Sequence, residues 1–270
     1  NVILRQGPTF LPASGAPMFN FISADVPSLP IFLTLCLVAF IAGIMRGFSG
    51  FGGGLLIAPV YSLFMPPADV VVLVIGLNLL TTIQLLPSIV RAVDWSLVFR
   101  LFIPSMIGVP IGVALLHSVD AELMRKVVAF IVTAMASLML LGWRYEGKRG
   151  RLQDGTVGLT SGLLTSIGGI GGPPTILYLL SDPRLSVEVF RTVCLMLFFL
   201  IQIFALAQIG FAGSLTQAQG GYILILLPAY VLAHWVGAVF FVRYVGHYQA
   251  QVRQISLWLL LFVGFVAFAL

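Results

Sequence analysis

Apolar runs, each close to the length that crosses a lipid bilayer, recur along this 270-residue chain. A transmembrane helix needs about 20 mostly apolar residues. Because lipid offers no hydrogen bonds to a peptide backbone, runs of this kind fold as helices. The long runs are Val70–Pro87, Leu97–His117, Leu123–Trp143, Val189–Gln208, Gly221–Val242 and Ile255–Leu270. The sequence therefore predicts an all-α polytopic membrane protein.

Composition supports the membrane interpretation over a soluble one. The chain is 60% hydrophobic and 9% charged, whereas soluble domains are about 45–50% apolar and roughly 25% charged. The net charge of +5 comes from basic residues scattered among short loops, which indicates membrane orientation and excludes nucleic acid as the expected partner. The two cysteines, Cys36 and Cys194, lie inside apolar runs and are expected to be small buried hydrophobes.

The two halves of the chain have the same order of segments. Each half consists of a short segment, a glycine stretch, a second short segment and three long segments. The first half has short segments at Pro30–Met45 and Leu55–Phe64 around Gly47–Gly54, and the second has Val157–Ser166 and Thr175–Leu180 around Gly168–Pro174. Gly50-Phe51-Gly52-Gly53 matches Gly169-Ile170-Gly171-Gly172 at an offset of 119 residues. An internal duplication of this kind is typical of secondary transporters.

We divide the chain accordingly into a first repeat at 29–143, a basic loop at 144–154 and a second repeat at 155–270. The N-terminal segment 1–28 has no helical periodicity. We expect the native protein to start at Met18 and this segment to be disordered in part.

Basic residues in short loops set the orientation of a membrane protein. The loop Arg144–Arg151 carries four of them, so we place it in the cytoplasm. The loops Ser118–Glu122 and Gly210–Gln217 carry none, so we place them outside. This threading puts both termini outside and makes the halves inverted copies of each other. We expect a multi-pass protein of the inner (plasma) membrane.

The glycine stretches predict broken helices, which survive at membrane depth only where they are buried or line a cavity. After each break a short helix starts, and its N-terminus offers free N–H groups and a partial positive charge to an anion. We expect these donors near Gly52–Gly54 and Gly171–Thr175. The alternative is close helix packing, because Gly-x-x-x-Gly spacings such as Gly50 to Gly54 also dock membrane helices.

Two arginines beside the breaks are candidates for neutralising an anion, because a guanidinium is always charged and offers a planar fork of donors. Arg46 abuts the first glycine stretch, and its alternative is to snorkel to the interface. Arg191 lies one turn past Glu188, and its alternative is an ion pair with that carboxylate. The amides Asn78 and Gln202 and the hydroxyls of Ser49, Thr165 and Ser166 are further candidates, each with helix bridging or backbone bonding as its alternative.

No carboxylate lies in the middle of a predicted span, which favours an anion over a cation as substrate. His234 lies in mid-span and is the candidate for proton coupling, with hydrogen-bonded packing as its alternative. The sequence shows no metal-ligand spacing, P-loop or catalytic triad motif. We therefore expect neither an enzyme nor a cofactor, and no metal.

The segments GFSGFGGGLLIAPV (Gly47–Val60) and SIGGIGGPPTILYLL (Ser166–Leu180) resemble the two signature segments of the TauE/SafE family, also called the sulfite exporter family. The resemblance implies transport of sulfite, sulfoacetate or a related organosulfur or carboxylate anion. It also implies that residues of the paired motifs line the path. Pro173-Pro174 departs from the common form of the second motif, which puts a symmetrical pair of sites in doubt.

We thus expect a secondary transporter that exports a small anion by alternating access, in contact with the lipid bilayer. The alternatives are an anion channel of the same specificity and a membrane scaffold subunit that transports nothing. A homodimer is left open, because lipid-facing and partner-facing apolar surfaces look alike. The expected substrate-binding residues are Arg46, Ser49, Gly50, Gly52, Gly53, Asn78, Gly169, Gly171, Gly172, Thr175, Arg191 and Gln202.

Overall fold

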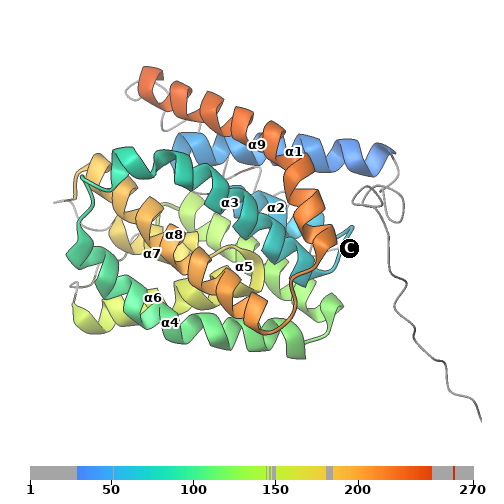
Figure 1. Cartoon of the computed structure of the whole chain (residues 1–270). Helices are drawn as coiled ribbons and strands as arrows, with labels where there is room; N and C mark the ends of the chain where they lie inside the picture. The colour runs from blue at the N-terminus through green and yellow to red at the C-terminus, as the bar shows by residue number, and fades with distance from the viewer. Residues whose placement is uncertain are drawn as a thin grey trace, which may run out of the picture.

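The computed structural model describes residues 29–50, 52–143, 145, 147, 150–180, 185–244 and 258, and within them the regular structure is entirely helical (Figure 1). The helices are α1 (Leu29–Ser49), α2 (Gly53–Tyr61), α3 (Pro67–Ile89), α4 (Trp95–Ser118), α5 (Ala121–Leu140), α6 (Arg151–Gly168), α7 (Gly172–Leu179), α8 (Val187–Phe211) and α9 (Gln217–Tyr244). Six helices of this described part, α1, α3, α4, α5, α8 and α9, are long and apolar enough to cross a membrane.

Large apolar side chains on the outside of these helices agree with a lipid environment. Leu33 of α1, Phe130 of α5 and Leu224 of α9 are each more than half exposed. A soluble surface does not carry so many exposed apolar groups side by side. The prediction of an all-α polytopic membrane protein is confirmed.

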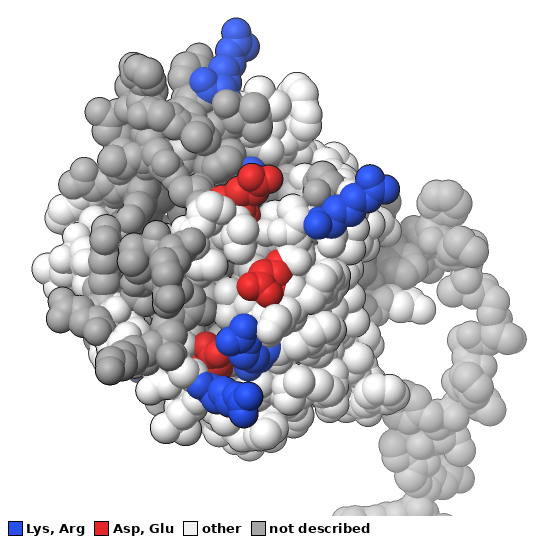
Figure 2. All heavy atoms as spheres, turned by 90° about the vertical axis from the view of Figure 1, so that its left-hand side faces the viewer, with Lys and Arg blue, Asp and Glu red and all other residues white. Residues whose placement is uncertain are grey.

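Charged side chains gather at the end of the molecule where α3 passes into α4 and α8 begins (Figures 1 and 2). Arg91, Asp94 and Arg100 are exposed around the first turn of α4. Asp94 caps that helix by accepting a hydrogen bond from the backbone N–H of Leu97 at 3.1 Å. The basic residues Arg91 and Arg100 around this loop predict a cytoplasmic position, and the sidedness of this end stays a prediction.

Several helix boundaries differ from those predicted, and two of the differences bear on the glycine stretch and on the loop 144–154. Helix α1 continues through Gly47 to Ser49, because the glycines there pack against a neighbouring helix instead of opening the chain. Helix α6 begins at Arg151, within the residues 144–154 that were expected to form a loop. The helix starts this early because Asp154, which is 3% exposed, belongs to the packed interior and not to a loop on the surface. The predicted last span, Ile255–Leu270, lies outside the described residues apart from Trp258.

The first helix of each half packs on the fourth helix of the other half, so that α1 lies along α9 and α6 along α4. Glycines make both contacts close. A side chain at Gly43 of α1 would meet the backbone oxygen of Tyr230 at 2.7 Å, and one at Gly162 of α6 would meet that of Ser105 at 2.5 Å. Gly43 and Gly162 are related by the 119-residue offset. The duplicated position therefore serves the same purpose in both halves, which is close helix packing.

A tyrosine at the far end of each short helix closes the hairpin that the glycine break opens. The hydroxyl of Tyr61 in α2 donates to the backbone oxygen of Leu35 in α1 at 2.7 Å. The hydroxyl of Tyr178 in α7 donates to Asp154 Oδ1 in α6 at 2.6 Å. Each short helix is thus tied at its C-terminal end to the helix that precedes it.

Candidate anion-binding cavity

The two glycine breaks contact each other in the interior. Gly50, Gly52 and Gly169 have φ angles of 79°, 95° and 66°, a left-handed conformation that only glycine adopts readily. A side chain at Gly54 would collide with the backbone oxygen of Gly169. Both breaks therefore need glycine, first to turn the chain and then to let the two turns approach.

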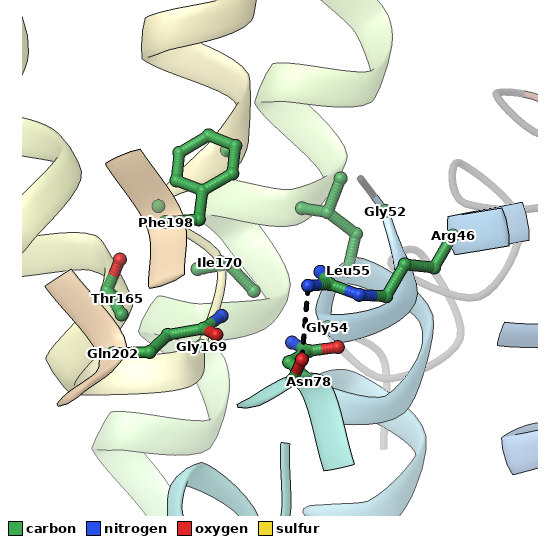
Figure 3. A pocket seen from close by; sticks show the side chains of 12 residues that line it. Arg46, Gly52, Gly54, Leu55, Asn78, Thr165, Gly169, Ile170, Phe198 and Gln202 are labelled. Atoms are coloured by element: carbon green, nitrogen blue, oxygen red, sulfur yellow. Dashed lines mark hydrogen bonds between the residues drawn. The ribbon is translucent and has the colours of Figure 1, made fainter. Parts of the chain in front are cut away.

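A cavity lies between the breaks, with walls from both halves of the chain (Figure 3). Helices α1, α2 and α3 form one wall, and α6, α7 and α8 form the other. The residues that line it are Arg46, Gly52, Gly54, Leu55, Asn78, Thr165, Gly169, Ile170, Gly171, Gly172, Phe198 and Gln202.

Arg46 brings a positive charge to the cavity. Its side chain is 3% exposed, so it does not snorkel to the interface. The guanidinium Nη2 donates to Thr82 Oγ1 at 2.8 Å and to the backbone oxygen of Asn78 at 3.4 Å. In the part of the chain that the structure describes, no carboxylate lies within salt-bridge distance of it. A buried cation without a counter-ion is costly, and an anion in the cavity would supply the missing charge.

The polar side chains of Asn78 and Gln202 face the cavity from opposite sides (Figure 3). Asn78 Oδ1 accepts a hydrogen bond from the hydroxyl of Tyr230 at 2.7 Å, so its amide nitrogen is turned to the cavity side. Gln202 is 3% exposed, and its Oε1 is buried with no partner among the described residues. Buried polar atoms in native proteins are nearly always hydrogen-bonded. Gln202 Oε1 is therefore the atom of the lining at which a donor group of a ligand or water would fit.

The backbone of α2 adds donors to the first wall. Its N-cap is Gly52, which has no side chain that could accept hydrogen bonds from the first turn. The N–H groups at the start of the helix therefore have no side-chain cap. On the second wall, the first turn of α7 contains Pro173 and Pro174, which have no N–H to donate. The first turn of α7 therefore has fewer N–H groups than that of α2.

Several predicted site residues lie beside the cavity without lining it. Gly53 lies under the hydroxyl of Tyr230, which a side chain there would meet. Thr175 Oγ1 shares a hydrogen bond of 2.6 Å with Ser161 Oγ, joining α7 to α6. A side chain at Gly50 would approach Arg191 Cγ at 3.5 Å. The side chain of Ser49 lies outside the described residues.

Arg191 and His234 lie near the end of α1 and are not among the residues that line the cavity. Arg191 is partly buried, and its Nη2 donates to the backbone oxygen of Gly47 at 3.5 Å. His234 is 4% exposed at the contact between α9 and α1. Within the described residues neither of its ring nitrogens has a hydrogen-bond partner, so the hydrogen-bonded packing role is not observed there.

The sequence did not single out the apolar part of the lining, which consists of Leu55, Ile170 and Phe198. Leu55 and Ile170 are immediate neighbours of the glycine motifs, and that proximity was the available signal. Phe198 is one of many apolar residues of α8, and nothing in its local sequence distinguishes it. Thr165 was named as a flanking hydroxyl, and it lines the cavity while donating to the backbone oxygen of Ser161 at 2.7 Å.

A family model described as "Sulfite exporter TauE/SafE" matches residues 35–267, a range that includes every residue lining the cavity. No curated protein and no solved structure matches the chain.

Proposed function

We propose that this chain, which belongs to the TauE/SafE sulfite exporter family, is a secondary transporter that binds a small anion in the cavity between the two glycine breaks. The substrate would be sulfite, sulfoacetate or a related organosulfur or carboxylate anion. The observation that carries the proposal is Arg46, a buried guanidinium that lines the cavity and has no carboxylate partner in the described structure.

The two walls of the cavity would contribute different interactions with the anion. Arg46 neutralises the charge of the anion, and the N–H groups at the start of α2 and the amide of Asn78 replace water around its oxygens. Charge-assisted hydrogen bonds of this kind are about twice as strong as neutral ones. Leu55, Ile170 and Phe198 exclude water from the rest of the surface. Gln202 Oε1 accepts a hydrogen bond from a protonated or hydroxyl group of the ligand, or from a water molecule that stays bound to the ligand.

Alternating access would follow from motion of one repeat against the other around this cavity. The α1–α9 and α4–α6 pairs each join the two halves through close glycine contacts, and such a motion would have to take place around these contacts. We further propose that the repeats are inverted, with both termini outside, loop 144–154 cytoplasmic and export across the plasma membrane as the direction. Two further candidates lie close to the end of α1. Arg191 would bind the anion along its path, and His234 would carry a coupled proton.

The test is trans-stimulated uptake of radiolabelled sulfite into proteoliposomes, comparing the wild type with Arg46→Gln and Arg100→Gln. Arg100 is the matched control, because it is exposed and bonds only to Ser96 of its own helix turn among the described residues. Hydrogen bonds to charged groups are worth about 1.5–3 kcal/mol, so Arg46→Gln is expected to reduce flux by at least about tenfold. Full flux in folded Arg46→Gln would overturn the assignment.

The same assay separates the alternatives. A channel conducts without trans-stimulation, so saturable counterflow favours a carrier. A scaffold subunit shows no flux for sulfite, sulfoacetate or acetate and copurifies with a stable partner. An imposed pH gradient that changes the counterflow of the wild type but not that of His234→Gln would assign proton coupling to His234.

A further inference from the structure

Tyr230 connects α9 to the cavity without lining it. The residue is fully buried, at 0% exposure. Its hydroxyl donates to Asn78 Oδ1 at 2.7 Å, across 152 residues of sequence from the second half of the chain to the first. No role for this tyrosine follows from the glycine motifs or from the charge pattern.

The direction of this hydrogen bond decides what Asn78 offers to the cavity. An amide has one accepting oxygen and one donating nitrogen on opposite sides of the group. With the oxygen engaged by Tyr230, the nitrogen faces the breaks and Gln202 (Figure 3). Rotated by half a turn, the same amide would present an oxygen to the anion and repel it. A tyrosine hydroxyl can donate or accept, but Asn78 Oδ1 is the acceptor that this hydroxyl has among the described residues. Rotation of the amide would leave the buried O–H of Tyr230 without an acceptor, which is costly, so the hydroxyl favours the donating face.

The same hydroxyl also lies against the first residue of α2. A side chain at Gly53 would collide with Tyr230 Oη, and its next neighbours, the backbone oxygen of Ala42 and Arg46 Cβ, lie at 3.4 and 3.5 Å. The hydroxyl of Tyr230 and the side chain of Arg46 therefore both lie beside Gly53, the first residue of α2. One hydroxyl touches the helix terminus and the amide that together form the donor wall.

We propose that Tyr230 is a positioning residue for anion recognition, holding the Asn78 amide with its N–H groups toward the ligand. This inference rests on the proposed function and adds the element that sets its affinity. Because Tyr230 is on α9 and Asn78 is on α3, movement of α9 away from α3 would release the amide. Substrate affinity would then fall when the helices separate, which is what release of an anion requires.

The test compares Tyr230→Phe with Tyr61→Phe. Tyr61 is the matched control, because it is equally buried and its hydroxyl donates to a backbone oxygen at the same distance of 2.7 Å, away from the lining residues. Sulfite, sulfoacetate and acetate are first screened by thermal shift, and the anion with the largest Arg46-dependent stabilisation serves as the probe. Its KM in counterflow is then measured for both variants.

Tyr230→Phe is expected to raise KM about five- to tenfold, since a buried hydrogen bond contributes on the order of 1 kcal/mol and 1.4 kcal/mol is tenfold. Tyr61→Phe is expected to lower the thermal stability by a similar amount and to leave KM unchanged. Gly53→Ala, which displaces the hydroxyl, is expected to shift KM in the same direction as Tyr230→Phe. Equal KM values for Tyr230→Phe and wild type would overturn the proposal.

A double-mutant cycle tests the route of the effect. In an Asn78→Ala background, Tyr230→Phe is expected to change KM by less than about twofold, because the group that it positions is gone. Additive effects of the two substitutions would overturn the role of Tyr230 as acting through Asn78, while leaving Arg46-dependent transport intact. If none of the anions stabilises the wild type, the carrier proposal falls and the positioning role falls with it.

Discussion

The two walls of the cavity have equivalent positions and different chemistry. Arg46 on α1 and Thr165 on α6 are related by the same 119-residue offset as the glycine motifs, and both line the cavity. One is a buried cation, and the other donates its hydroxyl to its own helix. The duplicated backbone was thus kept, whereas the charge is present on one wall only. Among the described lining residues the cavity has one charged wall and one neutral wall, which supports the proposal of a single anion site.

The helix termini show the same division. The α2 terminus starts with Gly53, Gly54 and Leu55, all of which have an N–H group. The α7 terminus has Pro173 and Pro174 in its first turn, which stiffen it and remove two donors. The comparison teaches that symmetry of a fold can supply the cavity while asymmetry of sequence decides what it binds.

The largest expected effect comes from a negative charge on the binding wall. Asn78→Asp places a carboxylate on the residue whose backbone oxygen already accepts from Arg46 at 3.4 Å. Because the new carboxylate would neutralise Arg46 internally and repel an anion, flux is expected to fall about a hundredfold. The control is Gln84→Glu, an exposed position on the same helix, for which flux should stay within about twofold of wild type. Retained flux in Asn78→Asp would remove Arg46 and Asn78 from the site.

The second largest expected effect is a loss of stability when a substitution pushes the two walls of the cavity apart. Gly54→Ala forces a methyl group into the backbone of Gly169 and to 2.9 Å from Val74 Cγ1. Overpacking of this kind costs about 1–3 kcal/mol, so the protein in detergent should melt at a lower temperature. Gly155→Ala is the control, because nothing lies within 4 Å of its Cβ position and alanine favours a helix by up to about 1 kcal/mol. A Gly54→Ala protein as stable as Gly155→Ala would show that the breaks do not touch.

The smallest effect is expected on the neutral wall. Thr165→Val removes a hydroxyl that donates within its own helix and keeps the shape of the side chain. The KM of the probe anion should change by less than about threefold, because no hydrogen bond to the ligand is lost. A larger rise in KM would mean that the second wall also contributes a donor, and the comparison drawn above would need to be redrawn.

Several features of the fold were predictable because they depend on local sequence. The length of an apolar run sets the presence of a span, and the candidate spans α3, α4, α5, α8 and α9 fall on predicted long runs. Helix α1 was predicted as a short segment, Pro30–Met45, and is long enough to cross the membrane. Arg46, Asn78 and Gln202 were also predictable as candidates, since polar side chains at membrane depth are costly and need a purpose. The role of each candidate stays a prediction until the variants above are measured.

Other features depend on what lies opposite each residue in space. Gly47 and Gly54 belong to the same glycine stretch, yet Gly47 packs against the backbone of His234 and Gly54 against that of Gly169. Nothing in the local sequence distinguishes helix docking from a contact between breaks. Likewise, Asp154 was expected in a loop and is buried, because its partner Tyr178 comes from the next helix.

The sequence by itself determined that this protein is a helical membrane bundle with two breaks at glycine stretches, because hydrophobic length and glycine conformation act over a few neighbouring residues. Only the tertiary structure decided which polar groups meet. Arg46, Asn78, Gln202 and Tyr230 come from four different helices. Their convergence depends on helix packing, whose close contacts are made between residues far apart in the chain. The affinity of the cavity is therefore a property of the packed bundle and is not encoded in either motif alone.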